Sequence, residues 1–215
     1  MQIISHRGLW KDSSDKNKLQ SLKKSFDFGF GVETDIRDFN GELVICHDIP
    51  DGYKKEIIRV EELFKIYKSN HNKFSLALNI KSDGLQENLS TLLKQYDIKN
   101  YFFFDMSIPD SINYIKKDLN VFLRQSEFEK EVPFYNDIKG IWLDCFESIW
   151  YDRELIEKHL VNGKIICLVS EELHGRLHQP LWEKIKSWKF NLNDNIILCT
   201  DYPELANKFF ENGKK

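Results

Sequence analysis

The chain has 215 residues, of which 41% are hydrophobic and 30% are charged, and its formal net charge is -3. This composition is typical of a globular protein, and the small negative charge gives no basis for binding nucleic acid or an anionic membrane surface. No segment approaches the ~20 apolar residues of a membrane span, and no signal peptide is visible. The four cysteines lie in apolar runs without metal-ligand spacing, which predicts reduced core thiols. We therefore expect a cytoplasmic protein with no membrane span and no nucleic-acid partner.

Short β-type apolar runs alternate with longer amphipathic stretches along the chain. The expected strands are residues 2–6, 31–37, 42–47, 74–80, 100–105, 120–125, 139–145, 164–169 and 195–199. The expected helices are residues 19–28, 59–68, 85–96, 109–118, 152–161, 180–189 and 203–211. Residues 127–137, around Pro133, predict at most a short turn. His159 belongs to an apolar helical stripe and is predicted to be a packing or surface residue.

Asn40-Gly41 joins two of the apolar runs and predicts a tight hairpin, so that 42–47 pairs with 31–37. Without 42–47, eight strands remain, with helices in nearly every gap. This pattern predicts an α/β fold, a compact (β/α)8 TIM barrel formed by residues 1–215 as a single domain. A doubly wound open sheet is the alternative, but the chain has no glycine-rich nucleotide signature to support it.

Polar residues suited to phosphate chemistry follow the first predicted strands. In a TIM barrel the carboxyl ends of the strands form the functional face. His6-Arg7-Gly8 ends the first strand, and Glu33 and Asp35 share one face of the second because they are two residues apart. The further candidates at strand ends are His47, Asn79, Lys81, Asp105, Arg124, Asp144, Glu171 with His174, and Asp201.

In this order the residues resemble the glycerophosphodiester phosphodiesterases, which are related to the phosphatidylinositol-phospholipase-C-like barrels. The resemblance is carried by His6-Arg7-Gly8, Glu33-x-Asp35, Gly41 with Val44-x-x-His47-Asp48, Asn79-Ile80-Lys81 and Cys199-Thr200-Asp201-Tyr202-Pro203. It spans the chain and is most specific in the first third. It implies a phosphoric diester hydrolase that acts on a small-molecule phosphodiester, with a place in lipid metabolism.

The resemblance also implies a role for each residue. His6 and His47 would form the acid-base pair, and Arg7 and Lys81 would face the phosphate. Glu33 and Asp35 would bind a divalent metal, Mg²⁺ or Ca²⁺. Asn79 stands where the family usually has a third metal carboxylate, and its amide oxygen remains a candidate ligand.

The sequence departs from the family in two further places. The Pro-Glu-Asn-Thr segment after the first strand is absent, and Asn17-Lys18-Leu19 is only a partial echo of it. Residues 49–58 are short where many members carry an insertion that shapes the substrate pocket. The substrate is therefore expected to differ from simple glycerophosphodiesters, towards another glycerol- or sugar-linked phosphodiester.

Other interpretations of these residues stay open at this point. Glu33 and Asp35 could form an inward ion pair with Arg37 or Lys81, and Asp48 is expected to point away from His47 by strand alternation. A catalytically impaired phosphoester-binding protein is the alternative function. A barrel glycosidase that uses Asp144 and Glu171 is weaker because it leaves the histidines without roles. The loop 171–178 is either substrate-facing or a solvated polar loop.

Overall fold

The computed structural model describes residues 1–50, 57–70 and 73–211, so part of the short 49–58 stretch lies outside the described residues. The chain divides into two compact units. We call His6–Val121 the N-terminal unit, and Met1–Ser5 with the chain from Phe122 onward the C-terminal unit. Within the described residues, no helix is long and apolar enough to cross a membrane. The single-domain organisation stays a prediction.

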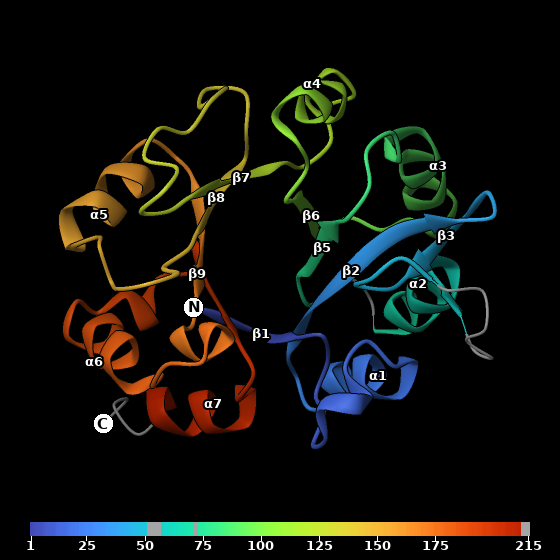
Figure 1. Ribbon diagram of the computed structural model, residues 1–215. Helices are drawn as coiled ribbons and strands as arrows, with labels where there is room; N and C mark the ends of the chain where they lie inside the picture. Colours follow the sequence, from blue (N-terminus) through green and yellow to red (C-terminus); the bar gives the residue numbers. More distant parts are fainter. Residues whose placement is uncertain (51–56, 71–72, 212–215) are drawn as a thin grey trace. The chain divides into compact units, whose positions relative to one another are not determined.

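The N-terminal unit is built on a mixed sheet with strand order β4-β3-β2-β5-β6. Its strands are β2 (Gly31–Phe39), β3 (Glu42–Ile45), β4 (Ile58–Arg59), β5 (Leu76–Ile80) and β6 (Tyr101–Phe104). Its helices are α1 (Leu19–Asp27), α2 (Val60–Ser69), α3 (Gln86–Tyr96) and α4 (Ile108–Lys116), with a 3-10 turn, η1 (Ser13–Asp15). β2, β5 and β6 are parallel, and β3 runs antiparallel to β2 beside it (Figure 1). β4 is antiparallel to β3.

The C-terminal unit has a fully parallel sheet with strand order β1-β10-β9-β8-β7. Its strands are β1 (Gln2–His6), whose last residue begins the other unit, β7 (Phe122–Gln125), β8 (Gly140–Leu143), β9 (Ile165–Val169) and β10 (Ile196–Thr200). Its helices are α5 (Arg153–Val161), α6 (Gln179–Ser187) and α7 (Pro203–Glu211), with 3-10 turns η2 (Glu171–His174) and η3 (Phe190–Leu192).

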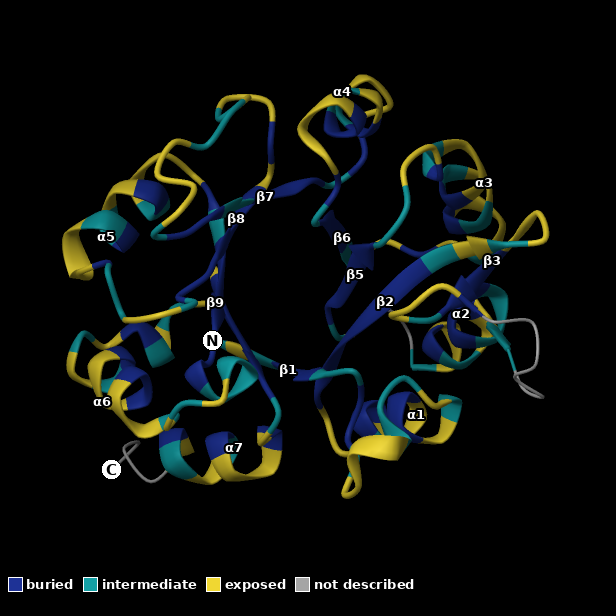
Figure 2. Cartoon of the chain, in the orientation of Figure 1, coloured by how far each residue is buried: buried dark blue, intermediate teal, exposed yellow. Residues whose placement is uncertain are grey.

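The strands form the buried part of each unit. Every residue of β5, β8 and β10 is buried, and the helices show one buried and one exposed face (Figure 2). Parallel strands covered by helices need apolar residues on both faces, which explains the continuous β-branched and aromatic runs. All four cysteines lie in the described part of the chain; none forms a disulfide bond there, and three of them are buried. The prediction of reduced core thiols is thus confirmed for Cys145, Cys167 and Cys199.

The predicted elements are confirmed with small shifts of their ends. The hairpin at Asn40-Gly41 has φ values of 50° and 80°, as expected for a tight turn of type I′. No α-helix forms in the gap 127–137. The sequence missed β4, a strand of two residues that exists because Ile58 pairs with Ile45 of β3. So short a strand leaves no periodic signal.

His159 is a buried histidine that carries a polar link between three segments of the C-terminal unit. Its Nε2 lies 2.8 Å from the Gln125 side-chain oxygen and its Nδ1 lies 2.9 Å from the Tyr135 hydroxyl. In the neutral ring Nε2–H donates to Gln125 and Nδ1 accepts from Tyr135. Burial, reinforced by Lys158 and Lys164, lowers the pKa of His159 from 6.5 to about 4.

Acidification is expected to destabilise the protein partly through this ring. Because the pKa of His159 is lower in the folded than in the unfolded chain, protonation favours the unfolded chain. The contribution of the neutral ring to the free energy of unfolding is complete above about pH 6.5 and is lost as the pH falls to about 4. We expect His159→Gln to remove roughly 2 kcal/mol of the stability lost between these pH values, after allowance for solvent screening. Urea unfolding of both proteins at several pH values measures the difference. His178→Gln, at the start of α6, is the control and should keep the wild-type slope. Equal slopes for wild type and His159→Gln would contradict the assignment.

Candidate active site

The candidate residues of the N-terminal unit lie within or directly after strands. His6 ends β1, Glu33 and Asp35 belong to β2, and Lys81 directly follows β5. Asn79 of β5 is the register partner of Asp35. Because register partners on neighbouring strands project to the same side of a sheet, Asn79 lies beside the Glu33 and Asp35 face. Glu33, Asp35 and Asn79 are only 1%, 0% and 7% exposed.

Asp35 is the centre of the charged contacts in this site. Its Oδ2 lies 2.8 Å from Arg7 Nε, its Oδ1 lies 3.4 Å from Lys81 Nζ, and the Asn17 amide donates to Oδ2 at 2.7 Å. The Arg7 Nε–H bond is not aimed at the carboxylate, so that contact is an ion pair rather than a hydrogen bond. Lys81 also lies 3.7 Å from Asp105 Oδ2. The ion pair that the sequence offered as an alternative is therefore present with Lys81.

Glu33 is also buried, and its surroundings disfavour the charged carboxylate. Burial, with the neighbouring Asp35 carboxylate, raises the pKa of Glu33 to about 8, against the opposing effect of Arg7 and Lys81. Its Oε2 lies 3.9 Å from His6 Nε2 and accepts the Arg7 backbone N–H at 3.2 Å. The first histidine of the candidate pair thus stands directly beside the first carboxylate.

The Arg7-Gly8 turn directs the guanidinium toward Asp35. Both residues have positive φ, 58° for Arg7 and 91° for Gly8. A Cβ atom on Gly8 would stand 2.7 Å from the Ser21 carbonyl carbon and 2.9 Å from the Leu22 nitrogen. Only glycine can therefore pass this close to the start of α1. The Arg7 backbone oxygen accepts the Asn17 N–H at 2.9 Å, which closes the loop before α1.

His47 follows the end of β3 and is more exposed than His6, with 47% of its side chain accessible against 15%. Its Nδ1 lies 2.8 Å from Asp48 Oδ1. The prediction that Asp48 points away is wrong, because β3 ends at Ile45 and strand alternation does not extend to residue 48. Arg37, the other ion-pair candidate, instead donates to the His47 backbone oxygen at 3.3 Å.

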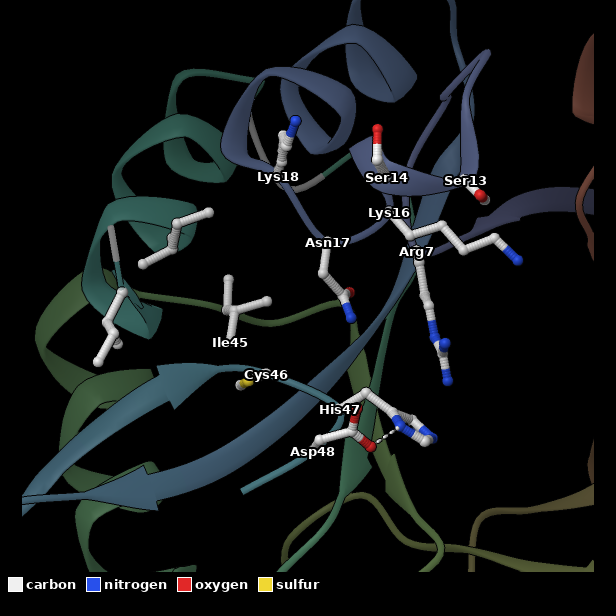
Figure 3. Close-up of a pocket in the computed structure, with 12 residues that line it drawn as sticks. Arg7, Ser13, Ser14, Lys16, Asn17, Lys18, Ile45, Cys46, His47 and Asp48 are labelled. Carbon is white, nitrogen blue, oxygen red and sulfur yellow. Dashed lines mark hydrogen bonds and ion pairs between the residues drawn. The ribbon is translucent and has the colours of Figure 1, made fainter. Parts of the chain in front are cut away.

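Arg7 and His47 line one pocket of about 500 Å³. In Figure 3 the side chains of Arg7, Lys16 and His47 extend toward the same side of this pocket, and the dashed line marks the His47–Asp48 contact. The structure thus places His6, Arg7 and Lys81 around the buried carboxylates, and places His47 with Arg7 at the pocket.

Sequence reasoning did not assign two residues of this site. Asn17 binds Asp35 and accepts the Thr34 hydroxyl at 2.8 Å, and Asp105 pairs with Lys81. Asp105 was a strand-end candidate without a role. Asn17 could have been found from the sequence, because Asn17-Lys18-Leu19 partly matches the Pro-Glu-Asn-Thr segment that follows the first strand in the glycerophosphodiester phosphodiesterases.

The buried oxygen atoms fit a hard divalent cation. Within residues 1–50, 57–70 and 73–211, no group of three or more His, Cys, Asp or Glu side chains could hold a metal ion. The third oxygen donor here is an amide. Asp35 Oδ1 and Asn79 Oδ1 are both buried without a hydrogen-bond partner, and carboxylate and amide oxygens suit Mg²⁺ and Ca²⁺. A cation bound by Glu33, Asp35 and Asn79 would satisfy these two oxygens.

The C-terminal unit carries a separate polar cluster at its strand ends. His174 Nε2 lies 2.7 Å from Asp144 Oδ1, and Arg176 Nε donates to Glu171 at 3.3 Å. Arg176 also donates to the backbone oxygens of Cys145 and Phe146. The loop 171–178, which begins as η2, is therefore anchored through buried carboxylates. The two carboxylates of the glycosidase alternative are both engaged in these contacts.

Comparison with solved structures identifies the fold. No protein-family model and no curated protein sequence gives a significant match. A glycerophosphodiester phosphodiesterase from Agrobacterium tumefaciens matches with a TM-score of 0.71 and 14% identity, over 98% of this chain and 99% of that chain. A phosphodiesterase from Oleispira antarctica, solved with its product sn-glycerol-3-phosphate, matches with a TM-score of 0.70 and 17% identity, over 98% and 97% of the two chains.

A third structure agrees with these two. A glycerophosphoryl diester phosphodiesterase from Parabacteroides distasonis matches with a TM-score of 0.72 and 14% identity, over 98% of this chain and 86% of that chain. The chain therefore has the α/β fold of these proteins, a TIM barrel. The predicted fold class is confirmed, and the resemblance carried by the motifs is confirmed as a likeness of fold.

Proposed function

We propose that the chain is a metal-dependent phosphodiester hydrolase that acts on a glycerol- or sugar-linked phosphodiester. The observation that carries the proposal is the buried Glu33 and Asp35 pair, with His6, Arg7 and Lys81 in contact with it. The likeness in fold to three phosphodiesterases supports the same class of reaction. A cytoplasmic location remains part of the proposal, supported by four cysteines that form no disulfide bond in the described residues.

The cationic side chains would bind the phosphate. Arg7 offers a planar fork that matches two phosphate oxygens, and Lys81 offers a point charge. Both are about one-fifth exposed, and both are held by Asp35. Glu33, Asp35 and Asn79 would hold the metal, Mg²⁺ or Ca²⁺, which when bound supplies positive charge beside the phosphate oxygens.

The two histidines would move the protons. One imidazole accepts the proton of the attacking hydroxyl, and the other donates a proton to the leaving oxygen. Asp48 accepts a hydrogen bond from Nδ1–H of His47 and so leaves Nε2 as the atom that exchanges protons. The Nε2 atom of His6 lies 3.9 Å from Oε2 of Glu33.

The first test is hydrolysis of a panel of phosphodiesters. Glycerophosphodiesters and bis-nitrophenyl phosphate are offered with Mg²⁺, Ca²⁺ or Mn²⁺. His6→Ala is expected to lower kcat by about 10²- to 10⁴-fold, the usual contribution of a general acid or base. His178→Ala is the matched control and should retain activity. Turnover no higher than that of His6→Ala across the whole panel would overturn the proposal.

A catalytically impaired phosphoester-binding protein is the second candidate, because the third donor, Asn79, is a neutral amide and no three-carboxylate group is present in the described residues. Calorimetry separates the two candidates. A binding protein takes up a phosphodiester without consuming it, whereas an enzyme releases product.

Asn79→Asp is expected to raise the affinity for Mg²⁺ or Ca²⁺ by about tenfold, because the charge of the ligands tunes cation affinity. The substitution changes charge with little change of shape. In chelator the variant should melt below the wild type, since a third carboxylate then joins Glu33 and Asp35 and faces Asp35 across the β2–β5 register. Metal titration by calorimetry and thermal melting measure both effects. Asn113→Asp, on the exposed surface of α4, is the control. Unchanged affinity in Asn79→Asp would place the cation elsewhere.

A further inference from the structure

The pocket lined by Arg7 and His47 is larger than a phosphate group requires. It is formed by three segments of the N-terminal unit: residues 13–18 before α1, residues 45–48 after β3, and residues 57–58 at β4. Its volume of about 500 Å³ is that of a site for a small organic ligand. A phosphate held by Arg7 would leave most of this volume for the group esterified to it.

The two sides of the pocket differ in chemistry. Arg7, Lys16 and His47 extend to one side in Figure 3, while Ile45 and Cys46 lie on the other. Ile57 and Ile58 add to the apolar lining. Ile58 is the cross-strand partner of Ile45, so their positions are fixed by the β3–β4 ladder. Isoleucine side chains favour contact with an aliphatic group, because the contact removes apolar surface of both from water.

The described lining offers few partners to a cationic occupant. It includes three cations, of which Arg7 is paired with Asp35 and Lys18 with Asp15, and one carboxylate, Asp48, which lies 2.8 Å from the His47 ring. The third cation is Lys16. The described lining residues include no aromatic ring except the imidazole of His47, whereas recognition of a quaternary ammonium group uses aromatic faces or carboxylates. A choline or ethanolamine group would therefore find no aromatic cage among the described lining residues, and would lie near the Lys16 ammonium.

We propose that this pocket holds the alcohol portion of the phosphodiester and selects an uncharged aliphatic alcohol over a cationic one. The inference rests on the proposed function and names its substrate class. Each methylene group that reaches the isoleucine wall should raise kcat/KM by about fourfold, the value expected for burying one CH₂ group. The gain should stop when the apolar side is filled.

The test is a series of sn-glycerol 3-phosphate esters that differ only in the alcohol. The ethyl, butyl, hexyl and octyl esters are compared with the choline and ethanolamine esters at fixed Mg²⁺ or Ca²⁺. We expect kcat/KM to rise along the alkyl series, and the choline ester to be at least tenfold poorer than the butyl ester. A flat alkyl series, or a choline ester as good as the butyl ester, would overturn the inference.

Variants locate the effect in this pocket. Ile57→Ser and Ile58→Ser are expected to flatten the rise with chain length, whereas Val161→Ser, at an 87% exposed position on α5, should keep the wild-type slope. Lys16→Glu should improve the choline ester relative to the ethyl ester several-fold, and Lys94→Glu on α3 should not. Slopes unchanged in both isoleucine variants would place the alcohol elsewhere and would also overturn the inference.

The two proposals fail in different ways. If no ester is hydrolysed with any metal, the proposed function fails. If the esters are hydrolysed without preference for the aliphatic alcohol, the proposed function stands and the substrate class named here is wrong.

Discussion

Asp35→Asn is expected to lower the free energy of unfolding by about 3 kcal/mol and to reduce phosphodiester turnover at least about 100-fold. The side chain of Asp35 is fully buried, and it compensates two cations that are themselves only partly exposed, Arg7 at 21% and Lys81 at 19%. The asparagine keeps the shape but leaves both positive charges without their buried counterion. Removal of one partner from such a group costs more than the pair contributes.

Urea unfolding and steady-state kinetics measure the two effects together. Asp38→Asn is the matched control, because Asp38 belongs to the same strand but is exposed. Its side chain accepts the Ser82 hydroxyl at 2.7 Å, and its backbone N–H donates to the same hydroxyl. Its free energy of unfolding should change by less than about 0.5 kcal/mol. If Asp35→Asn were as stable as Asp38→Asn, the ion pairs drawn around Asp35 would not exist in solution.

Gly8→Ala is expected to destabilise the protein by about 3 to 4 kcal/mol. The added methyl would stand under 3.0 Å from backbone atoms of Ser21 and Leu22, at a φ of +91°. Backbone atoms at the start of α1 cannot rotate away as a side chain can. Relief of the overlap would instead move the Arg7-Gly8 turn, so the guanidinium would leave Asp35 and activity would fall with stability.

Gly29→Ala separates the two causes of this loss. Gly29 has a similar φ of +87°, but a Cβ atom there meets nothing within 4 Å. It should lose only the ~1 kcal/mol of a left-handed backbone conformation. Comparison of the two variants by urea unfolding isolates the close approach to α1. Equal losses in both would refute the tight packing at Gly8.

Much of the fold could be predicted because the strands are buried on both faces. Continuous β-branched and aromatic runs, such as those of β5 and β10, stand out from the amphipathic helices between them. β4 could not be predicted, since its two residues form a strand only by pairing with β3. The division into two compact units is a property of three-dimensional contacts and leaves no mark in the composition.

The positions of the site residues could be predicted for those that lie in regular strands. Alternation places Glu33 and Asp35 on one face, and the parallel β2–β5 register places Asn79 next to Asp35. The contacts of Arg7 and Asn17 with Asp35 depend on left-handed turns, with φ values of 58° and 63°, which the sequence does not specify. Asp48 was predicted wrongly because the alternation was extended beyond the end of β3.

Every residue of the candidate site comes from the N-terminal unit. Selection for catalysis therefore acts directly on the N-terminal unit, whereas the C-terminal unit is selected mainly for folding. A change between residues 6 and 105 can abolish chemistry in a chain that still folds, whereas a change after residue 122 falls in the unit that contributes no residue to this candidate site. Divergence should accumulate faster in the second half, where the motifs that resemble the glycerophosphodiester phosphodiesterases are already sparse.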